Sequence, residues 1–248
     1  MLVAGNWKMH TDLSEAVRLA SEVARTVENE DVAVAVCPPF ISLEAVAEML
    51  RDSTVRLGAQ TMHDEEKGAF TGEVSAPMLV SVGCHYVILG HYERPQLFGE
   101  TDESVNRKVK AAMQHGLVPI VCVGETLEER EAGEAEVVVR RQLDAGLDGI
   151  ALDAADTLVV AYEPVRAIGT GKTATPEQAQ DMHRTIRDRL TELLGASGSE
   201  VELLYGGSVK PGNAAELFAQ NDIDGGLIGG ASLDAEQFAA IVAAAAQA

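Results

Sequence analysis

The stretch that decides the fold reads TLVVAYEPVRAIGTGKT and covers residues 157–173. Its first part, residues 158–162, is a continuous apolar run, which is typical of a strand buried on both faces. Pro164 cannot donate a ladder hydrogen bond, so the strand ends near Glu163 and leaves a carboxylate at its carboxyl end. A loop with two glycines follows, and TPE at 175–177 has the pattern of a helix start. The stretch predicts a strand–loop–helix unit; alone, it is equally typical of an ordinary connection with a solvated glutamate.

Seven other apolar runs, each stopped by glycine, proline or polar residues, alternate with helical patterns along the chain. Together with the first stretch they predict eight strands, at 2–5, 32–36, 55–59, 86–90, 118–123, 158–162, 201–205 and 226–228. The first predicted helix runs to residue 27, begins at Thr11 or Asp12, and has Leu13, Val17, Ala20 and Ala24 on one face. The other predicted helices cover 42–51, 75–82, 102–115 (capped by Asp102), stretches up to 143, 175–194, 213–219 and a tail near 238–248.

Eight strand–helix units without a linker or a change of composition favour one domain, residues 1–248. Their alternation predicts an α/β fold, a single closed (β/α)8 barrel of the TIM type. A doubly wound open sheet alternates in the same way and is the alternative. The strand count of eight, and the lack of a GxGxxG pattern after the first strand, favour closure.

Composition limits the partners and the compartment. Hydrophobic residues make up 46% of the 248 residues and charged residues 23%, as in an ordinary globular protein. The net charge of -20, from 39 acidic and 19 basic residues, disfavours nucleic acid and anionic membranes as partners. Three cysteines without CxxC spacing indicate reduced thiols, and the first residues show no signal-peptide pattern. We therefore expect a cytoplasmic protein.

Chemically useful residues follow several of the predicted strands. Asn6 and Lys8 come after the first strand, His91 and Glu93 after the fourth, and Glu163 after the sixth. The carboxyl ends of parallel barrel strands share one face, which is where the active sites of such barrels form. A lone histidine is more often structural and a lone lysine is more often a surface charge. The prediction of an active site therefore depends on all of these residues lying at the same end of the barrel.

Glycine turns follow the last two strands, as GGS at 206–208 and GG at 229–230. In such barrels these loops commonly hold a phosphate with backbone N–H groups, and glycine lets the main chain approach the oxygens closely. Lys8 is the main cation expected to face that anion. Because screening at physiological salt extends over about 8 Å, such a local site can outweigh a distant acidic surface.

Seven segments, in order along the whole chain, resemble the triosephosphate isomerase family. They are AGNWKMH (4–10), GAFTGE (68–73), ILGHYER (88–94), VCVGETLEERE (121–131), AYEPVRAIGTGKTATPEQA (161–179), YGGSVK (205–210) and IGGASL (228–233). The combination of these motifs is highly specific. The resemblance implies that the protein interconverts dihydroxyacetone phosphate and glyceraldehyde 3-phosphate in glycolysis and gluconeogenesis, through an enediolate, without a cofactor or a metal ion.

The resemblance also implies a role for each residue at the strand ends. Glu163 is implied to take the proton from the carbon beside the carbonyl and to return it to the neighbouring carbon. His91, as a neutral imidazole, is implied to polarise the carbonyl and to move a proton between the two oxygens. Lys8, with Asn6, is implied to stabilise the enediolate, and Glu93 to organise the network of Lys8.

Substrate binding and closure are assigned on the same basis. Besides Asn6 and Lys8, the phosphate ligands are implied to be backbone N–H groups of Gly169, Ser208, Gly229 and Gly230. Tyr205 and Ser208 are implied to hold a closed lid, which expels water and protects the enediolate. The lid residues are Pro164, Val165, Arg166, Ala167, Ile168, Gly169, Thr170, Gly171, Lys172, Thr173 and Ala174.

The irregular segment 60–73 resembles the loop through which enzymes of this family form dimers. The resemblance implies a homodimer in which Thr71 reaches the partner's Asn6 and the partner's His91. The expected partners of the chain are therefore a second copy of itself and a triose phosphate, with no nucleic acid and no membrane.

Three positions depart from the family pattern. Arg166 stands where a tryptophan is usual in the lid, Tyr92 replaces the serine after the histidine, and Pro95 replaces an arginine. They leave two other functions open. One is an aldolase-like lyase in which Lys8 forms a Schiff base, and the other is a binding or scaffold protein on a barrel that has lost its activity.

Overall fold

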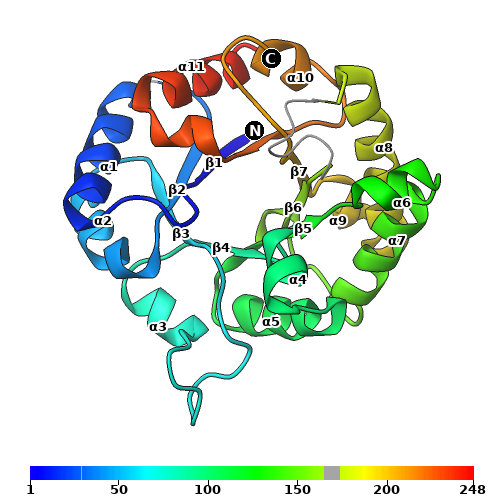
Figure 1. Ribbon diagram of the computed structural model, residues 1–248, viewed down its shortest axis with the longest axis horizontal. Coiled ribbons are helices and arrows are strands. Elements are labelled where there is room, and N and C mark those ends of the chain that lie inside the picture. Colours follow the sequence, from blue (N-terminus) through cyan, green and yellow to red (C-terminus); the bar gives the residue numbers. More distant parts are fainter. Residues whose placement is uncertain (29, 165–173) are drawn as a thin grey trace.

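The computed structural model describes residues 1–28, 30–164 and 174–248, and its strands close into one barrel (Figure 1). Each strand pairs in parallel with the next, and β8 pairs with β1. The predicted closed parallel barrel is therefore confirmed, and the open sheet is wrong. The strands are β1 (Leu2–Asn6), β2 (Ala33–Cys37), β3 (Arg56–Ala59), β4 (Tyr86–Leu89), β5 (Val118–Val123), β6 (Val159–Tyr162), β7 (Glu202–Tyr205) and β8 (Gly225–Ile228).

Helices surround the barrel as an outer ring (Figure 1). Between most strands the chain returns to the start of the barrel through one long helix or two shorter ones. Among the described residues, three 3-10 turns supplement them, η1 (Phe40–Ser42), η2 (Ala155–Thr157) and η4 (Gly230–Leu233). The α-helices are α1 (Leu13–Val27), α2 (Leu43–Met49), α3 (Ala76–Ser81), α4 (Glu93–Phe98), α5 (Asp102–Gln114), α6 (Leu127–Glu131), α7 (Ala135–Gly146), α8 (Pro176–Leu194), α9 (Ala196–Ser199), α10 (Ala214–Phe218) and α11 (Ala235–Ala245).

The strands are apolar on both sides because they separate two cores. One core fills the barrel and contains alternate residues of the strands, such as Leu2 and Ala4 of β1. The intervening residues, such as Val3, pack outward in a second core shared with the helices. This two-sided burial explains the unbroken apolar run of β6, which decided the fold from the sequence.

Several helices begin at a side chain that accepts hydrogen bonds from the first free N–H groups. Asp12 caps α1, and Thr175 caps α8 with Pro176 in its first turn, as the sequence predicts. The predicted cap of α5 is wrong by one residue: Thr101 accepts from the Ser104 amide, and Asp102 is the first helical residue.

The predicted buried face of α1 is wrong in part: Ala20 is buried and Ala24 packs partly buried against the core, but the face is turned around the helix from the one expected. Leu13 is 51% exposed, whereas the residues that pack on the barrel are Ala16, Leu19, Ala20, Val23 and Val27. The apolar stripe therefore lies about 75° around the helix from the one expected.

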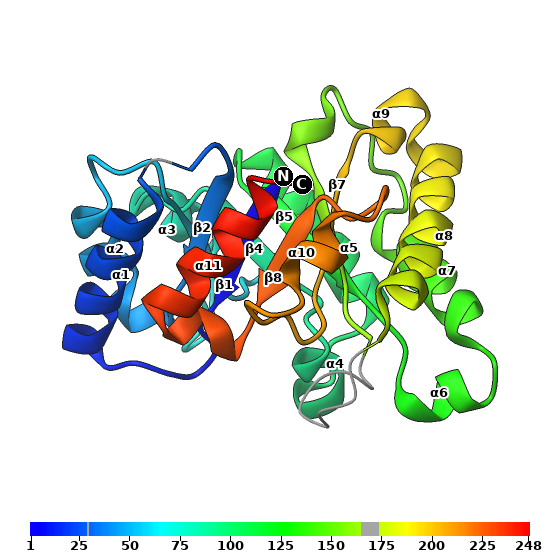
Figure 2. The ribbon, with the colours of Figure 1, turned by 90° about the horizontal axis from the view of Figure 1, so that it is seen from above.

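The two ends of the barrel differ. Figure 2 shows both chain termini at one end, and α4 and α6, which follow β4 and β5, at the other. This second end, where all strands have their carboxyl termini, carries the sequence-predicted functional residues. None of the described helices is long and apolar enough to cross a membrane.

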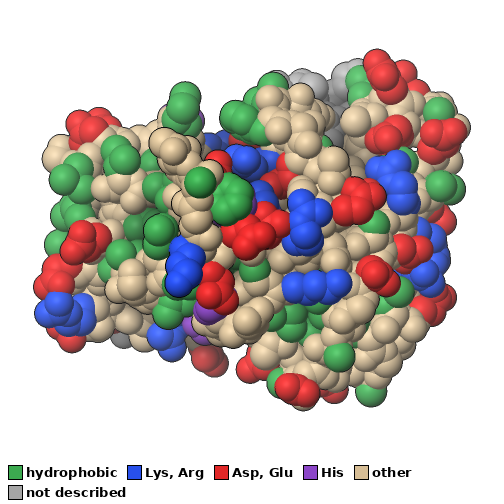
Figure 3. Space-filling view, turned by 90° about the horizontal axis from the view of Figure 1, so that it is seen from below, with side chains coloured by type: hydrophobic (Ala, Val, Ile, Leu, Met, Phe, Trp, Pro, Cys, Tyr) green, Lys and Arg blue, Asp and Glu red, His purple; other side chains and the backbone are tan. Residues whose placement is uncertain are grey.

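The loop of residues 60–73, between β3 and α3, projects from the side of the barrel (Figure 1). Its base is closed by a hydrogen bond from the His63 amide to the Val74 carbonyl, 2.8 Å long. Arg107 of α5 pairs with Asp64 at 2.6 Å, so the loop is also tied to the barrel wall. Its tip, residues 65–73, is exposed. Figure 3 shows the face from which it projects, with hydrophobic side chains gathered on the left half.

Candidate active site

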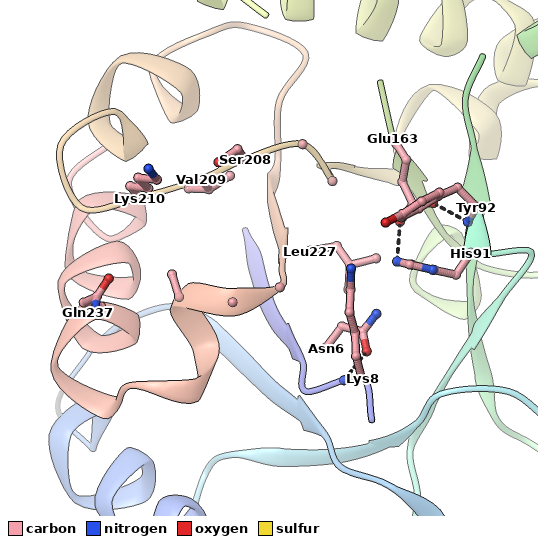
Figure 4. Close-up of a pocket in the computed structure, with 15 residues that line it drawn as sticks. Asn6, Lys8, His91, Tyr92, Glu163, Ser208, Val209, Lys210, Leu227 and Gln237 are labelled. Atoms are coloured by element: carbon pink, nitrogen blue, oxygen red, sulfur yellow. Dashed lines mark hydrogen bonds and ion pairs between the residues drawn. The ribbon is translucent and has the colours of Figure 1, made fainter. Parts of the chain in front are cut away.

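One cavity of about 440 Å³ opens among the carboxyl ends of the strands. Figure 4 shows its side chains converging from strands far apart in the chain, with Lys8 from the end of β1, His91 from the end of β4 and Glu163 from the end of β6. The lining residues are Asn6, Lys8, His91, Tyr92, Glu163, Gly206, Gly207, Ser208, Val209, Lys210, Leu227, Gly229, Gly230, Ala231 and Gln237.

The backbone at the end of β6 holds Glu163 in a fixed position. Its amide donates to the Val123 carbonyl at 2.8 Å, which continues the ladder between β5 and β6. The residue is only 2% exposed. Gly206 makes room for its side chain, since a Cβ atom there would lie 2.8 Å from Cγ of Glu163. A buried carboxylate is thus aimed into the cavity by backbone geometry.

Two hydrogen-bond donors hold the Glu163 carboxylate. The Tyr92 amide donates to Oε2 at 2.9 Å, and Nε2 of His91 lies 3.2 Å from Oε1. Burial raises the pKa of Glu163 above its usual 4.5, while the Tyr92 amide and the Lys8 charge act in the opposite direction. The residue is therefore a stronger base than a glutamate in water.

The start of α4 sets the tautomer of His91. The Glu93 amide points at Nδ1 over 3.4 Å, a long hydrogen bond in which Nδ1 accepts. Nε2 then carries the proton and faces the carboxylate. Burial lowers the pKa of His91 below 6.5; the Glu93 charge opposes this and the Lys8 charge adds to it. The site holds a neutral imidazole with an N–H directed into the cavity.

Lys8 reaches the cavity from a constrained backbone. Its φ of 51° is in the left-handed region, and its amide donates to Oδ1 of Asn6 at 3.0 Å. The Gln60 side-chain amide donates to the Lys8 carbonyl at 2.8 Å. Nζ pairs with Glu93 at 3.0 Å. Burial acts to lower the pKa of Lys8, but the bond to Glu93 and the nearby negative charges outweigh it and raise the pKa, so the ammonium stays charged.

The opposite side of the cavity is built from the two glycine turns. Figure 4 shows Ser208 and Lys210 there, across from His91. The Asn213 side chain donates to the Ser208 carbonyl at 3.0 Å. Ser232 donates to the Gly229 carbonyl through its amide and its hydroxyl, at 2.8 and 2.7 Å. One carbonyl group in each turn is therefore paired within the protein, as suits a surface that receives an anion.

The structure brings most of the sequence-predicted residues together. Glu93 lies behind the cavity rather than on its wall and contacts it through Lys8 and His91. Thr71 is exposed on the projecting loop, outside the cavity. Residues 165–173, which include Gly169, Arg166 and most of the predicted lid, lie outside the described residues. The cavity-lining residues among those predicted are Asn6, Lys8, His91, Glu163, Ser208, Gly229 and Gly230.

The sequence did not point to several residues that shape this site. Gln60 donates to the carbonyls of both Lys8 and Cys37, each at 2.8 Å, and so ties β1 to β2. Lys210 adds a second cation near the glycine turns, although the motif YGGSVK contains it. Behind β6, buried Glu125 accepts from Arg130 at 2.6 Å and from the Tyr162 hydroxyl at 3.0 Å. In the sequence, the only signal for this cluster is the presence of Glu125 and Arg130 together in the motif VCVGETLEERE.

In the part of the chain that the structure describes, no three His, Cys, Asp or Glu side chains are grouped as metal ligands are. The arrangement instead offers a buried base, a neutral N–H donor, a cation and an anion-binding surface around one small cavity. Such a set suits proton transfer next to the carbonyl group of a small phosphorylated compound.

Comparison with known proteins gives a consistent result. A family model described as triosephosphate isomerase matches residues 1–245. Triosephosphate isomerase of Symbiobacterium thermophilum is 55% identical over 249 residues, covering 100% of this chain and 97% of the relative. That of Chloroflexus aurantiacus is 54% identical over 243 residues, covering 97% of each chain. The crystal structure of triosephosphate isomerase from Bartonella henselae has a TM-score of 0.90 and 37% identity, covering 98% of each chain.

Proposed function

The chain belongs to the triosephosphate isomerase family and interconverts dihydroxyacetone phosphate and glyceraldehyde 3-phosphate in glycolysis, and from this premise we propose how its residues divide the reaction. Glu163 is the base, His91 the neutral electrophile, and Lys8 with Asn6 stabilises the enediolate. The 3.2 Å separation of Glu163 Oε1 and His91 Nε2 inside the cavity carries this proposal. A base and an N–H donor this close act on adjacent atoms of one three-carbon compound.

Substrate must separate this pair when it binds. At 3.2 Å no carbon atom fits between Oε1 of Glu163 and Nε2 of His91. The substrate carbonyl oxygen therefore replaces the carboxylate as the acceptor of the Nε2 proton, and the carboxylate turns to the adjacent C–H. Losing the His91 donor to the substrate makes Glu163 more basic at the moment when it removes the proton.

Charge then develops on the carbonyl oxygen. The protonated Nε2 of His91 meets it, and Lys8 supplies the nearest positive charge. Because His91 enters the step as neutral imidazole, it donates its proton to one oxygen and recovers one from the other. These groups are in place before the reaction, so they stabilise the enediolate without reorganising.

We assign the phosphate of the substrate to the turns at Ser208, Gly229 and Gly230, with Gly169 of the lid. The paired carbonyls of Ser208 and Gly229 and the nearby cation Lys210 support this assignment. Residues 164–174 form the lid, which excludes water from the enediolate. At its end, the Ala174 amide approaches the buried hydroxyl of Tyr205, and this supports a role for Tyr205 in holding the lid.

The state of His91 provides a test. An ordinary histidine is largely cationic at about pH 6, but we expect the His91 imidazole to be neutral there, with its proton on Nε2. The cause is burial together with the Glu93 amide at Nδ1. Nitrogen-15 NMR of the free protein, assigned with His91→Gln, reads both the charge and the tautomer. A cationic ring, or a proton on Nδ1, would contradict the proposal.

The lyase alternative does not agree with the site. A Schiff-base lysine must be neutral to attack a carbonyl. Lys8 instead has a raised pKa and pairs with Glu93 at 3.0 Å, which holds it as an ammonium ion. The family assignment and its activity also exclude the inactive scaffold.

We further propose that the protein is a homodimer formed through the 60–73 loop. The loop is anchored at its base, yet its tip contains exposed Phe70, and exposed Met78, Leu97 and Phe98 lie on the neighbouring helices α3 and α4. Apolar side chains grouped on one face of a protein commonly mark an interface (Figure 3). In the dimer, Thr71 reaches the partner's Asn6 and the partner's His91.

Placing a charge at the loop tip tests the dimer. We expect Thr71→Arg to weaken association at least tenfold, because an unpaired charge buried in an interface costs several kcal/mol, of the order of a hundredfold in affinity. Activity should fall with the dimer fraction. Sedimentation velocity over a concentration series measures both states. Val137→Arg, at a 69% exposed position on α7, is the control and should sediment as the wild type does. A monomeric wild type would contradict the proposal.

We also assign the chain to the cytoplasm, acting as one catalytic domain over residues 1–248. Cys37, Cys84 and Cys122 are all free, buried thiols, which supports a reducing compartment. The glycolytic activity of the family supports the same compartment.

A further inference from the structure

We propose that Tyr92 is a positioning residue for Lys8, and that its aromatic ring holds the lysine ammonium against Glu93 in the orientation that meets the substrate. The inference rests on the proposed role of Lys8 in substrate binding. It adds a residue that shapes this site without itself taking part in proton transfer.

Three contacts group Tyr92, Lys8 and Glu93 together. The Lys8 ammonium lies over the Tyr92 ring, 5.3 Å from its centroid, within the range of a cation–π interaction. Oε1 of Glu93 accepts from the ammonium at 3.0 Å. The Tyr92 hydroxyl donates to this same Oε1 over 3.4 Å. The ring and the carboxylate thus contact the ammonium from two sides, and the cavity lies on a third.

The backbone holds the ring of Tyr92 where these contacts form. Tyr92 precedes the first residue of α4, and its amide donates to Glu163 at 2.9 Å. Its ring also packs on the imidazole of His91, with centroids 4.7 Å apart. Figure 4 shows the Tyr92 side chain extending across the cavity from the His91 strand. A tyrosine has few rotatable bonds, so little entropy is lost in ordering it there.

The Tyr92 ring restricts the Lys8 ammonium more than the ion pair with Glu93 can do alone. Lys8 and Glu93 are both partly exposed, and ion pairs in that setting contribute little because water screens them. A lysine side chain also has many rotamers, which substrate binding must otherwise restrict. The ring of Tyr92 removes water from one side of the ammonium and limits those rotamers in the free enzyme. Less ordering then remains to be done when the substrate binds.

The charged groups around the Tyr92 hydroxyl keep it a donor. Burial raises the pKa of Tyr92, with Lys8 opposing and the Glu93 and Glu163 charges reinforcing the increase. The phenol therefore stays protonated at neutral pH and donates to Glu93. This also keeps the ring neutral, so its attraction for Lys8 comes from the π face.

Fluorinated phenylalanines at position 92 test the proposal, because fluorine weakens the π face with little change in size. In the series from Tyr92→Phe to its trifluorinated analogue, we expect KM for glyceraldehyde 3-phosphate to rise stepwise, by about fivefold in total. We expect kcat to change by less than about twofold, since the ordered ammonium serves the bound substrate and the transition state alike. A merely steric role would not follow the number of fluorine atoms.

The same helix offers a matched control. The Arg94 guanidinium lies over the Phe98 ring at 4.8 Å, but neither residue lines the cavity. The same fluorinated analogues at position 98, assayed at a protein concentration at which the protein is fully dimeric, should leave KM unchanged. A KM that stays flat along the position 92 series would overturn the proposal, as would an equal rise along both series.

The experiment also distinguishes a failure of this inference from a failure of the proposed function. If the proposed function were wrong, the Glu163→Gln variant would keep full isomerase activity, whatever KM the variants at position 92 have. Tyr92→Leu supplies a second measure: it keeps bulk but removes the π face, so its KM should resemble that of the trifluorinated variant. A KM for Tyr92→Leu equal to that of Tyr92→Phe would also overturn the role of the ring.

Discussion

Replacing the buried base by its amide, Glu163→Gln, is expected to lower kcat about 10²- to 10⁴-fold, the usual contribution of a positioned general base. The amide has nearly the same size and can still accept from the Tyr92 amide, so the fold and KM change little. It cannot accept a proton from carbon. Steady-state isomerisation in both directions measures the loss, and exchange of the substrate C–H with deuterium from the solvent falls with it.

A second glutamate provides the control. Glu202 is partly buried, which raises its pKa, but it lies at the start of β7 and pairs with the amino terminus at 3.4 Å, away from the cavity. Glu202→Gln keeps full turnover. If Glu163→Gln retained more than about a tenth of the wild-type kcat, another group would have to be the base.

The same carboxylate sets the acid side of the pH profile. Only ionised Glu163 accepts a proton, so kcat/KM falls as the pH drops through its pKa. Because burial raises that pKa, the loss begins at a higher pH than an ordinary glutamate would give. The substrate phosphate also titrates, so the profile is measured with a phosphonate analogue as well, and the part of the profile common to both belongs to the enzyme.

The second large effect concerns the backbone behind the base. A Cβ atom at Gly124 would lie 2.0 Å from the Glu163 carbonyl oxygen and 2.8 Å from its carbon. Gly124 cannot retreat, because the Gln142 side chain donates to its carbonyl at 3.0 Å and accepts from its amide at 2.8 Å. Gly124→Ala therefore displaces Glu163 or breaks the Gln142 bonds. We expect a free energy of unfolding lower by about 3 kcal/mol or more, and a kcat reduced at least tenfold.

Urea unfolding and steady-state kinetics check this prediction. Gly212→Ala is the matched control, because a Cβ atom at Gly212 meets nothing within 4 Å and its backbone is not in the left-handed region. It should leave stability within about 0.5 kcal/mol of the wild type. A Gly124→Ala protein with wild-type kcat would show that the Glu163 backbone moves without cost.

Two short helices show the limits of local patterns. α4 has the sequence ERPQLF and α9 has ASGS, and neither was expected. They are too short to show a helical period, and Pro95 looks like a helix breaker in sequence. In the structure Pro95 is the third residue of α4, where its missing N–H would have no partner in the helix.

The sequence by itself determined the eight strands, the closed barrel and the kinds of residue at the strand ends. Apolar runs, prolines and glycines determine local structure over a few residues, so these features can be predicted from the sequence without knowledge of tertiary contacts. It also determined the family, through the motifs around His91 and Glu163.

Only the tertiary structure decided how those residues act. Barrel closure brings Lys8, His91 and Glu163 into one small cavity from strands that are far apart in the chain. Two contacts of Lys8 depend on distances across that cavity: the hydrogen bond from Gln60 to its carbonyl, and the Tyr92 ring beside its ammonium. The same is true of the burial that lowers the pKa of His91 and raises the pKa of Glu163. Electrostatic and hydrogen-bond energies change within a few ångströms, and no local pattern of residues encodes such separations.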